Sequence, residues 1–142
     1  MRSLTMEQLS VGDAAQFTKT VTETDVALFA AISGDFNPVH VDAEFAKTSL
    51  FGRRVAHGPL TLALAAGVLG MHLPGVGTIA VTNHIDYRRP VFIGDTITTR
   101  GEVAELDPEA NRARIALTWV NQDGTLVADG YAVVMPPKSP AL

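Results

Sequence analysis

The second half of the chain has the hydrophobic pattern of a series of β-strands. Four segments have this pattern: 77–87, 95–105, 113–121 and 126–134. In the third, Ile115, Leu117 and Trp119 occur at every second position, so they fall on one face of a strand. The Gln-Asp-Gly sequence at 122–124 predicts a hairpin before the last strand. A further strand, rich in β-branched and aromatic residues, is predicted at 14–21.

The first half of the chain has helical spacing instead. Four apolar residues recur at this spacing: Val26, Phe29, Ala30 and Ile32. Thr22 or Thr24 offers an N-cap, and the Ser-Gly-Asp sequence at 33–35 ends the helix. A second short helix is predicted from Asp42 to Thr48, with Asp42 as its cap.

Residues 58–73 are apolar on almost every side, and alanine and leucine dominate. A helix that is hydrophobic all round is usually buried. Pro59 suits the first turn of such a helix, and the Pro-Gly sequence at 74–75 ends it. Long antiparallel strands after one buried helix predict an α+β fold, in which a curved antiparallel sheet wraps around the helix. A partner subunit is one explanation for what covers the other face of the sheet.

The length and composition predict one globular domain. We place this domain at 1–136 of the 142 residues and a loose, proline-rich tail at 137–142. The chain contains no cysteine, which excludes a disulfide framework, a thiolate zinc site and a cysteine nucleophile. The absence of cysteine fits a reducing compartment, and we expect a cytoplasmic protein.

Neither a membrane nor a nucleic acid is predicted as a partner. The N-terminus has no apolar stretch of the length that a signal peptide needs. The longest apolar run, 59–73, is interrupted by glycines and by His72, and it is too short to span a bilayer. The net charge is −4 with scattered Lys and Arg, which gives no electrostatic footprint for nucleic acid.

The candidate chemistry begins with a carboxylate and an imidazole that lie close together in the sequence. Asp35 and His40 are five residues apart, and the Asn-Pro turn at 37–38 can fold both side chains toward one point. An Asp and a His that share a water molecule can perform general acid–base catalysis, because one accepts a proton while the other donates one.

The start of the predicted buried helix supplies a second functional group. The N–H groups of its first turn have no partner within the helix and carry partial positive charge. Gly58 lets a ligand approach this backbone without a side chain in the way. A carbonyl oxygen placed there would be polarised as in an oxyanion hole, so the three groups together suit enolate chemistry next to a carbonyl.

The Asp-x-Asn-Pro-x-His motif at 35–40, followed by His-Gly at 57–58, resembles the MaoC-like, R-specific enoyl-CoA hydratase family. Residues 87–95 look like the family's loop between two sheet strands. The resemblance extends over nearly the whole chain and implies a hot-dog fold and at least a homodimer, with the active site near the subunit boundary.

The resemblance also implies residue roles. Asp35 and His40 would activate a water that adds to C3 of a trans-2-enoyl thioester, while C2 receives a proton on the same face. The N–H of Gly58 would bind the thioester oxygen, and Asn37 would help to order the site. The product would be an R-3-hydroxyacyl thioester. No cofactor is implied beyond the coenzyme A that the substrate carries.

Further residues are candidates for contacts with the substrate. Those for the acyl thioester are Ser33, His57, Pro59, Leu69 and Val133. Those for the phosphates of coenzyme A are Arg53, Arg54, Arg88 and Arg89, because guanidinium suits phosphate geometry. A structural role for His57, which would fix the loop before Gly58, and a solvated loop for each arginine are the alternatives. Members of the family often carry proline at the position of Arg54 and serine at that of Ala66.

Other interpretations of the sequence stay open beside the hydratase. These are action on another acyl carrier or a substituted acyl group, an acyl-thioesterase, and a non-catalytic hot-dog module that binds acyl thioesters. His72 and His84 have no partner visible in the sequence and are interpreted as bystanders. No metal site is expected, since no pair of histidines has a helical ligand spacing such as His-x-x-x-His.

Overall fold

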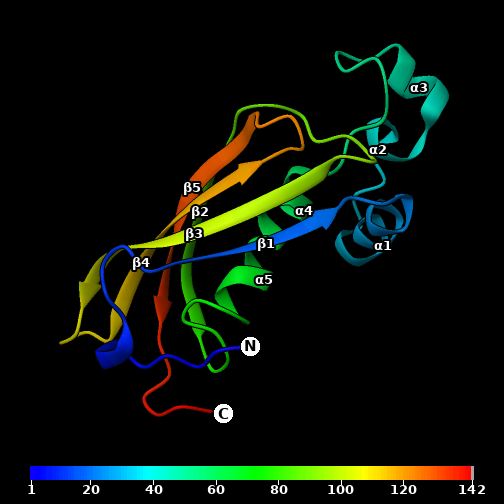
Figure 1. Ribbon diagram of the computed structural model, residues 1–142. Coiled ribbons are helices and arrows are strands. Elements are labelled where there is room, and N and C mark those ends of the chain that lie inside the picture. The colour runs from blue at the N-terminus through cyan, green and yellow to red at the C-terminus, as the bar shows by residue number, and fades with distance from the viewer. Residues whose placement is uncertain (142) are drawn as a thin grey trace.

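The computed structural model describes residues 1–141, in which five strands and five α-helices follow a short 3-10 turn (Figure 1). In chain order they are the turn Met6–Gln8, β1 (Ala14–Thr20), α1 (Glu23–Ser33), α2 (Pro38–Val41), α3 (Ala43–Lys47), α4 (Gly58–Ala63), α5 (Ala65–Leu69), β2 (Ile79–Tyr87), β3 (Thr96–Asp107), β4 (Arg112–Val120) and β5 (Leu126–Met135). All five strands and the helices equivalent to α1 and α3 were expected from the sequence.

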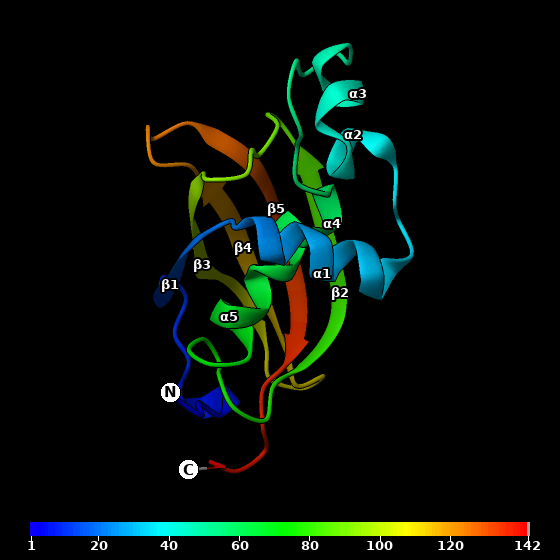
Figure 2. The same cartoon turned by 90° about the vertical axis from the view of Figure 1, so that its right-hand side faces the viewer.

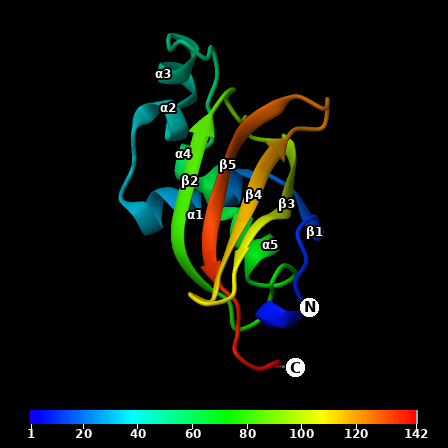
Figure 3. The ribbon, with the colours of Figure 1, turned by 90° about the vertical axis from the view of Figure 1, so that its left-hand side faces the viewer.

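The five strands form one antiparallel sheet in the order β1-β3-β4-β5-β2. The sheet curves around α4 and α5, and α1 covers the same face (Figure 2). Viewed from its other side, the sheet lies in front of α1 and α4, while α2 and α3 stand beside it (Figure 3). The expected α+β fold, a curved sheet wrapped around a central helix, is therefore confirmed.

The core lies between the concave face of the sheet and the central helices. On β4 the buried residues are Ala113, Ile115, Leu117 and Trp119, and the alternate ones are at least partly exposed. The predicted face of this strand is thus confirmed. Val68 and Leu73 pack against it from the helical side. Each buried aliphatic side chain of this size contributes about 1.5–3 kcal/mol of hydrophobic stabilisation.

The central helix differs from the single helix predicted at 58–73. It consists of two short helices, α4 and α5, that meet at Leu64, and it ends at Leu69. Around Leu64 the backbone tightens to 3-10 geometry, because its N–H bonds to the Thr61 carbonyl and its carbonyl accepts from Gly67. The predicted burial is confirmed for most of the helix, whereas one side of it, which includes Ala63 and Ala66, is exposed.

Helix caps fix the segment that precedes the central helix. Thr22 caps α1 in a capping box with Asp25, and Gly34 ends that helix in the left-handed conformation at φ 76°. Asp42 caps α3 by accepting two N–H bonds, as the sequence predicted. The sequence did not predict α2, a single turn that begins after Asn37. The segment that includes α2 and α3 projects beyond the end of the sheet (Figure 1).

The chain termini lie together at the opposite end of the molecule (Figure 1). Residues 137–141 have no regular secondary structure, but Ala141 donates an N–H bond to the Ser3 hydroxyl at 2.8 Å. Leu142, the end of the predicted tail, lies outside the described residues. Within residues 1–141 no helix is long and apolar enough to cross a membrane.

Candidate active site

Asp35 lies in the turn between α1 and α2, where local hydrogen bonds fix its orientation. Its N–H donates to the Ser33 hydroxyl at 3.1 Å, and its Oδ1 accepts the N–H of Asn37 at 3.1 Å. Asn37 is also the N-cap of α2, because its Oδ1 accepts the N–H of Val39 at 3.3 Å. Ser33 and Asn37 therefore hold the turn, and the Asp35 side chain, which is 49% exposed, presents Oδ2 toward His40.

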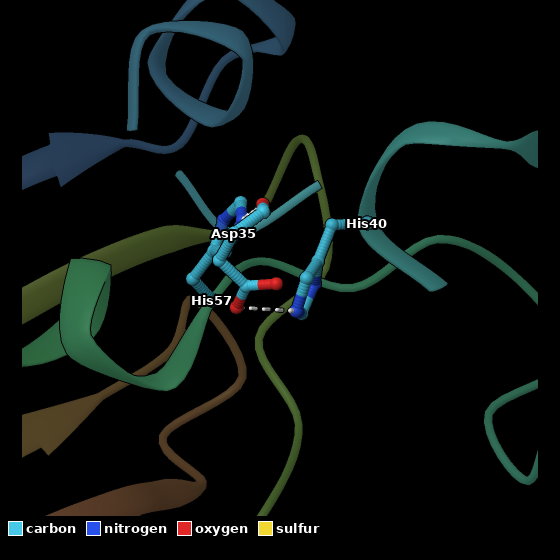
Figure 4. A group of neighbouring side chains, drawn as sticks. All are labelled: Asp35, His40 and His57. Carbon is cyan, nitrogen blue, oxygen red and sulfur yellow. Dashed lines mark hydrogen bonds and ion pairs between the residues drawn. The ribbon is translucent and has the colours of Figure 1, made fainter. Parts of the chain in front are cut away.

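His40 lies on α2 with its ring almost buried and its tautomer fixed. Nδ1 lies 2.8 Å from the carbonyl oxygen of Val55. A carbonyl only accepts, so Nδ1 carries a proton, and the neutral ring has its lone pair on Nε2. Nε2 points toward Asp35 Oδ2 at 3.8 Å (Figure 4). This separation exceeds a direct hydrogen bond, and a single water molecule can bridge the two atoms.

His57 lies beneath this pair and has no exposed surface. Its Nε2 donates to the main-chain carbonyl of Asp35 at 2.9 Å. Its ring stacks on that of His40 with 3.8 Å between centroids, and Phe29 packs on it at 4.9 Å. This burial favours the structural role for His57 over a direct contact with the substrate. The buried ring therefore supports the Asp35 main chain through a hydrogen bond and the His40 ring through stacking.

A cavity of about 350 Å³ opens beside His40, and Gly58 lines it. Gly58 begins α4, so its N–H has no partner within that helix. A methyl group added at Gly58 would lie 2.8 Å from Cζ of Tyr87, so only glycine permits this close approach. Burial raises the pKa of the Tyr87 phenol above its ordinary value.

Two of the four candidate arginines are engaged with carboxylates. Arg54 forms an ion pair with Glu23 at 2.6 Å and donates from Nε to the main-chain carbonyl of His40, also at 2.6 Å. Arg88 donates from Nε to Asp129 at 2.8 Å. The guanidinium groups of Arg54 and Arg88 are thus already held by the protein itself.

The other two candidate arginines share a groove. Within residues 1–141, neither Arg53 nor Arg89 has a carboxylate within 4.0 Å. Both line a hollow of about 270 Å³, and Arg89 also lines the cavity beside His40. Arg53 Cζ lies 3.7 Å from the centroid of the Phe92 ring, and this cation–π contact orients the guanidinium.

The predicted acyl contacts lie in different places. Pro59 is exposed at the start of α4. Leu69 lines a second cavity of about 290 Å³, together with Ala66 and Val134. Val133 lines none of these hollows, because side chains alternate along a strand and Val133 faces the side of β5 opposite to Val134. Val134, and not Val133, is thus the β5 residue beside Leu69.

Three residues near the site had no role assigned from the sequence. Val55 contributes only a backbone carbonyl, which leaves no signature in residue type. Phe29 follows helical spacing and is indistinguishable from other apolar core residues. Tyr87 ends a predicted strand directly before two arginines, and this position is the signal that could have pointed to a cavity wall.

The donor atoms of Asp35, His40 and His57 lie within 4.8 Å of one another. Metal binding requires imidazole lone pairs, which lie in the ring plane, to converge on one ion. The planes of His40 and His57 are stacked and only 28° apart, so their lone pairs do not converge. Two nitrogens are also occupied by the carbonyls of Val55 and Asp35. The arrangement suits acid–base chemistry better than metal ligation.

Residues 8–120 match the family model described as "MaoC like domain". Among curated proteins, the chain is 44% identical to a 3-hydroxybutyryl-CoA dehydratase of Methylorubrum extorquens, over 97% of this chain and 87% of that protein. It is 39% identical to an (R)-specific enoyl-CoA hydratase of Aeromonas caviae, over 94% of this chain and 100% of that protein. The chain belongs to the MaoC-like domain family.

Solved structures agree with this assignment. The unliganded R-hydratase PhaJ1 from Pseudomonas aeruginosa superposes with a TM-score of 0.92 at 42% identity, over 97% of this chain and 88% of that one. The (R)-hydratase from Aeromonas caviae superposes with a TM-score of 0.89 at 40% identity, over 92% of this chain and 99% of that one. The fold is the hot-dog fold that the sequence predicted.

Proposed function

We propose that this protein is an R-specific trans-2-enoyl-CoA hydratase, which also catalyses the reverse dehydration of 3-hydroxyacyl-CoA. One observation carries the proposal: Asp35 Oδ2 and His40 Nε2 face each other across 3.8 Å beside a cavity that exposes the backbone of Gly58. Relatives near 40% identity over almost their full length bear hydratase and dehydratase names, which supports the proposal.

The geometry suggests how water adds. A water between the two side chains donates one hydrogen bond to His40 Nε2 and one to Asp35 Oδ2. Its oxygen bonds to C3 of the enoyl group as the C2–C3 double bond shifts, and negative charge develops on the thioester oxygen. The N–H of Gly58 stabilises that charge. One of the two side chains accepts the proton that the water loses as the C3–O bond forms, and it delivers that proton to C2 on the same face. Water is consumed, and the pair returns to its starting protonation state.

Coenzyme A binding is assigned to the two arginines that have no carboxylate partner. Arg53 and Arg89 present guanidinium groups to one groove, and Arg89 connects that groove to the cavity beside His40. Guanidinium binds phosphate oxygens in a bidentate manner, and Arg53 is already oriented by Phe92. The thioester end of the substrate then enters the cavity while its phosphates remain at the rim.

The chain is also expected to assemble as a homodimer through the end of β2 that contains Ile79 and Val81. This strand is at an edge of the sheet, and Ile79 and Val81 on it are 59% and 48% exposed. An apolar edge strand with unpaired backbone groups is a ready site for pairing with another chain. Light scattering after size-exclusion chromatography is expected to give at least twice the chain mass, and a strictly monomeric mass would contradict this assembly.

The test of the proposed function is a direct assay of the purified protein. Crotonyl-CoA is expected to lose its conjugated enoyl absorbance without release of free thiol, as measured with a disulfide dye. Thiol release in step with substrate loss would identify a thioesterase instead. Calorimetric binding of crotonyl-CoA with no turnover would identify a binding module. Enoyl-CoAs of increasing length in the same assay give the chain-length preference.

A further inference from the structure

Arg54 links α1 to α2, the two helices that flank the turn containing Asp35. Its side chain is only 19% exposed. Nη1 reaches Glu23 at the start of α1, and Nε donates to the main-chain carbonyl of His40 on α2, each at 2.6 Å. The contact with His40 is made at the backbone, so it fixes the residue and leaves its imidazole free for chemistry.

The helix that carries His40 cannot hold its shape alone. α2 spans only Pro38–Val41, and a single helical turn is unstable because nucleation costs more than one hydrogen bond returns. Its end groups need external partners. At the N-terminal end, Asn37 Oδ1 accepts the N–H of Val39. At the C-terminal end, Arg54 donates to the carbonyl of His40, and its positive charge is favoured there by the helix dipole.

The residues next to Arg54 hold the same histidine by other atoms. The carbonyl of Val55 accepts the proton of His40 Nδ1 at 2.8 Å, and the N–H of Val55 bonds to the Val39 carbonyl at 3.3 Å. The N–H of Ala56 bonds to Val91 on the cavity rim at 2.8 Å. The segment 54–56 thus bonds to both the main chain and the ring of His40, and Ala56 bonds to Val91, which lines the cavity.

We propose that Arg54, held by Glu23, is a positioning residue that sets where His40 Nε2 lies relative to Asp35 and to the cavity. This inference rests on the proposed hydratase function for its kinetic consequences. It also differs from the expectation that Arg54 binds a phosphate of coenzyme A. A phosphate-binding residue would change KM for the substrate, whereas a residue that positions the base changes kcat.

The first test is therefore a comparison of kcat with KM. Arg54→Met removes both contacts at nearly constant apolar volume and is expected to lower kcat about tenfold with KM for crotonyl-CoA nearly unchanged, because slight misplacement of a catalytic group costs up to about 100-fold. Arg54→Lys is expected to recover part of kcat. Glu23→Gln, on a side chain that is 67% exposed, is expected to give a smaller loss in the same parameter.

The matched control is Arg100→Met. Arg100 also pairs with a carboxylate at 2.6 Å, that of Glu102, but it lies on β3 away from the site. This variant is expected to keep both kcat and KM. A loss in Arg54→Met that appears only in KM would overturn the proposal in favour of phosphate binding, and an unchanged kcat would overturn it outright.

A second readout does not depend on activity. In ¹⁵N NMR of the histidine rings, His40 in the native protein is expected to show a single tautomer with the proton on Nδ1, as the Val55 contact requires. Arg54→Met is expected to convert this signal to a mixture of tautomers, and Arg100→Met is expected to preserve it. An unchanged His40 signal in Arg54→Met would contradict the inference.

The two readouts separate failure of the inference from failure of the proposed function. If the native protein does not hydrate crotonyl-CoA, the proposed function is wrong, and the tautomer signal still tests whether Arg54 positions His40. If the native protein hydrates crotonyl-CoA but Arg54→Met keeps both the native kcat and the native His40 tautomer, only the inference about Arg54 is wrong.

Discussion

Asp35→Asn is expected to lower kcat for crotonyl-CoA hydration by at least about 100-fold, the lower limit for loss of a positioned acid–base group. Asparagine keeps the size of the side chain and the Oδ1 acceptor that binds the N–H of Asn37. It replaces the ionised oxygen that faces His40 with a neutral amide. The change therefore removes the ability to accept a proton while preserving the turn.

The chain offers a matched control for this substitution. Asp86 forms a second Asp–His pair, in which its Oδ2 lies 3.1 Å from His84 Nε2, and its side chain is 52% exposed. That pair is on β2 and lines none of the cavities described above. Asp86→Asn is expected to keep kcat within about twofold, as is usual for surface changes away from a site. Equal kcat in native protein and folded Asp35→Asn, judged by thermal unfolding, would remove Asp35 from the mechanism.

His40→Gln is expected to produce a loss of similar size, at least about 100-fold in kcat. Glutamine can place an amide near the Val55 carbonyl, but it provides no nitrogen lone pair that takes up a proton. KM is expected to change less than kcat, because the cavity is lined mostly by other residues. Steady-state kinetics on crotonyl-CoA measures both parameters.

His84→Gln is the control for His40→Gln. His84 pairs with a carboxylate, but its ring stacks on Tyr131 at 5.2 Å on the surface of the sheet. The His84 variant is expected to retain native kinetics. A His40→Gln protein with native kcat would show that Asp35 works without His40 and would contradict the proposed pair.

The strands and the caps were predictable because short-range physics determines them. The alternation of Ile115, Leu117 and Trp119 fixes which face of β4 is buried, and all three are at most 1% exposed. The cap residues Thr22 and Asp42 bond to N–H groups within three residues of themselves. Such patterns depend on neighbours in the sequence, so no tertiary information is needed to recognise them.

The features that the sequence did not reveal depend on contacts between distant segments. α2 is stabilised by Arg54, which lies fourteen positions after His40. The residues of α2 alone contain no sign of that contact. The burial of His57 follows from stacking on His40 and Phe29, which the fold brings together. Pairing of Arg54 and Arg88 with carboxylates is likewise tertiary, so sequence could not rank the four arginines.

The site as a whole is a set of side chains supported by backbone groups. Asp35 is held by Ser33 and Asn37, and His40 by the Val55 carbonyl, so Asp35 Oδ2 and His40 Nε2, the atoms proposed to react, face each other without direct contact. Gly58 contributes only its backbone, and Tyr87 fills the space that a side chain would take. Pre-oriented groups of this kind lower a barrier because they require little reorganisation during the reaction.

The most direct measurement of the central claim is the stereochemistry of hydration in D₂O. If Asp35 and His40 deliver both parts of one water from a single face, the product is R-3-hydroxybutyryl-CoA with one deuterium at C2, added syn to the hydroxyl. Chiral chromatography and proton NMR of the product decide this. An S product, or deuterium on the face opposite to the hydroxyl, would contradict the account.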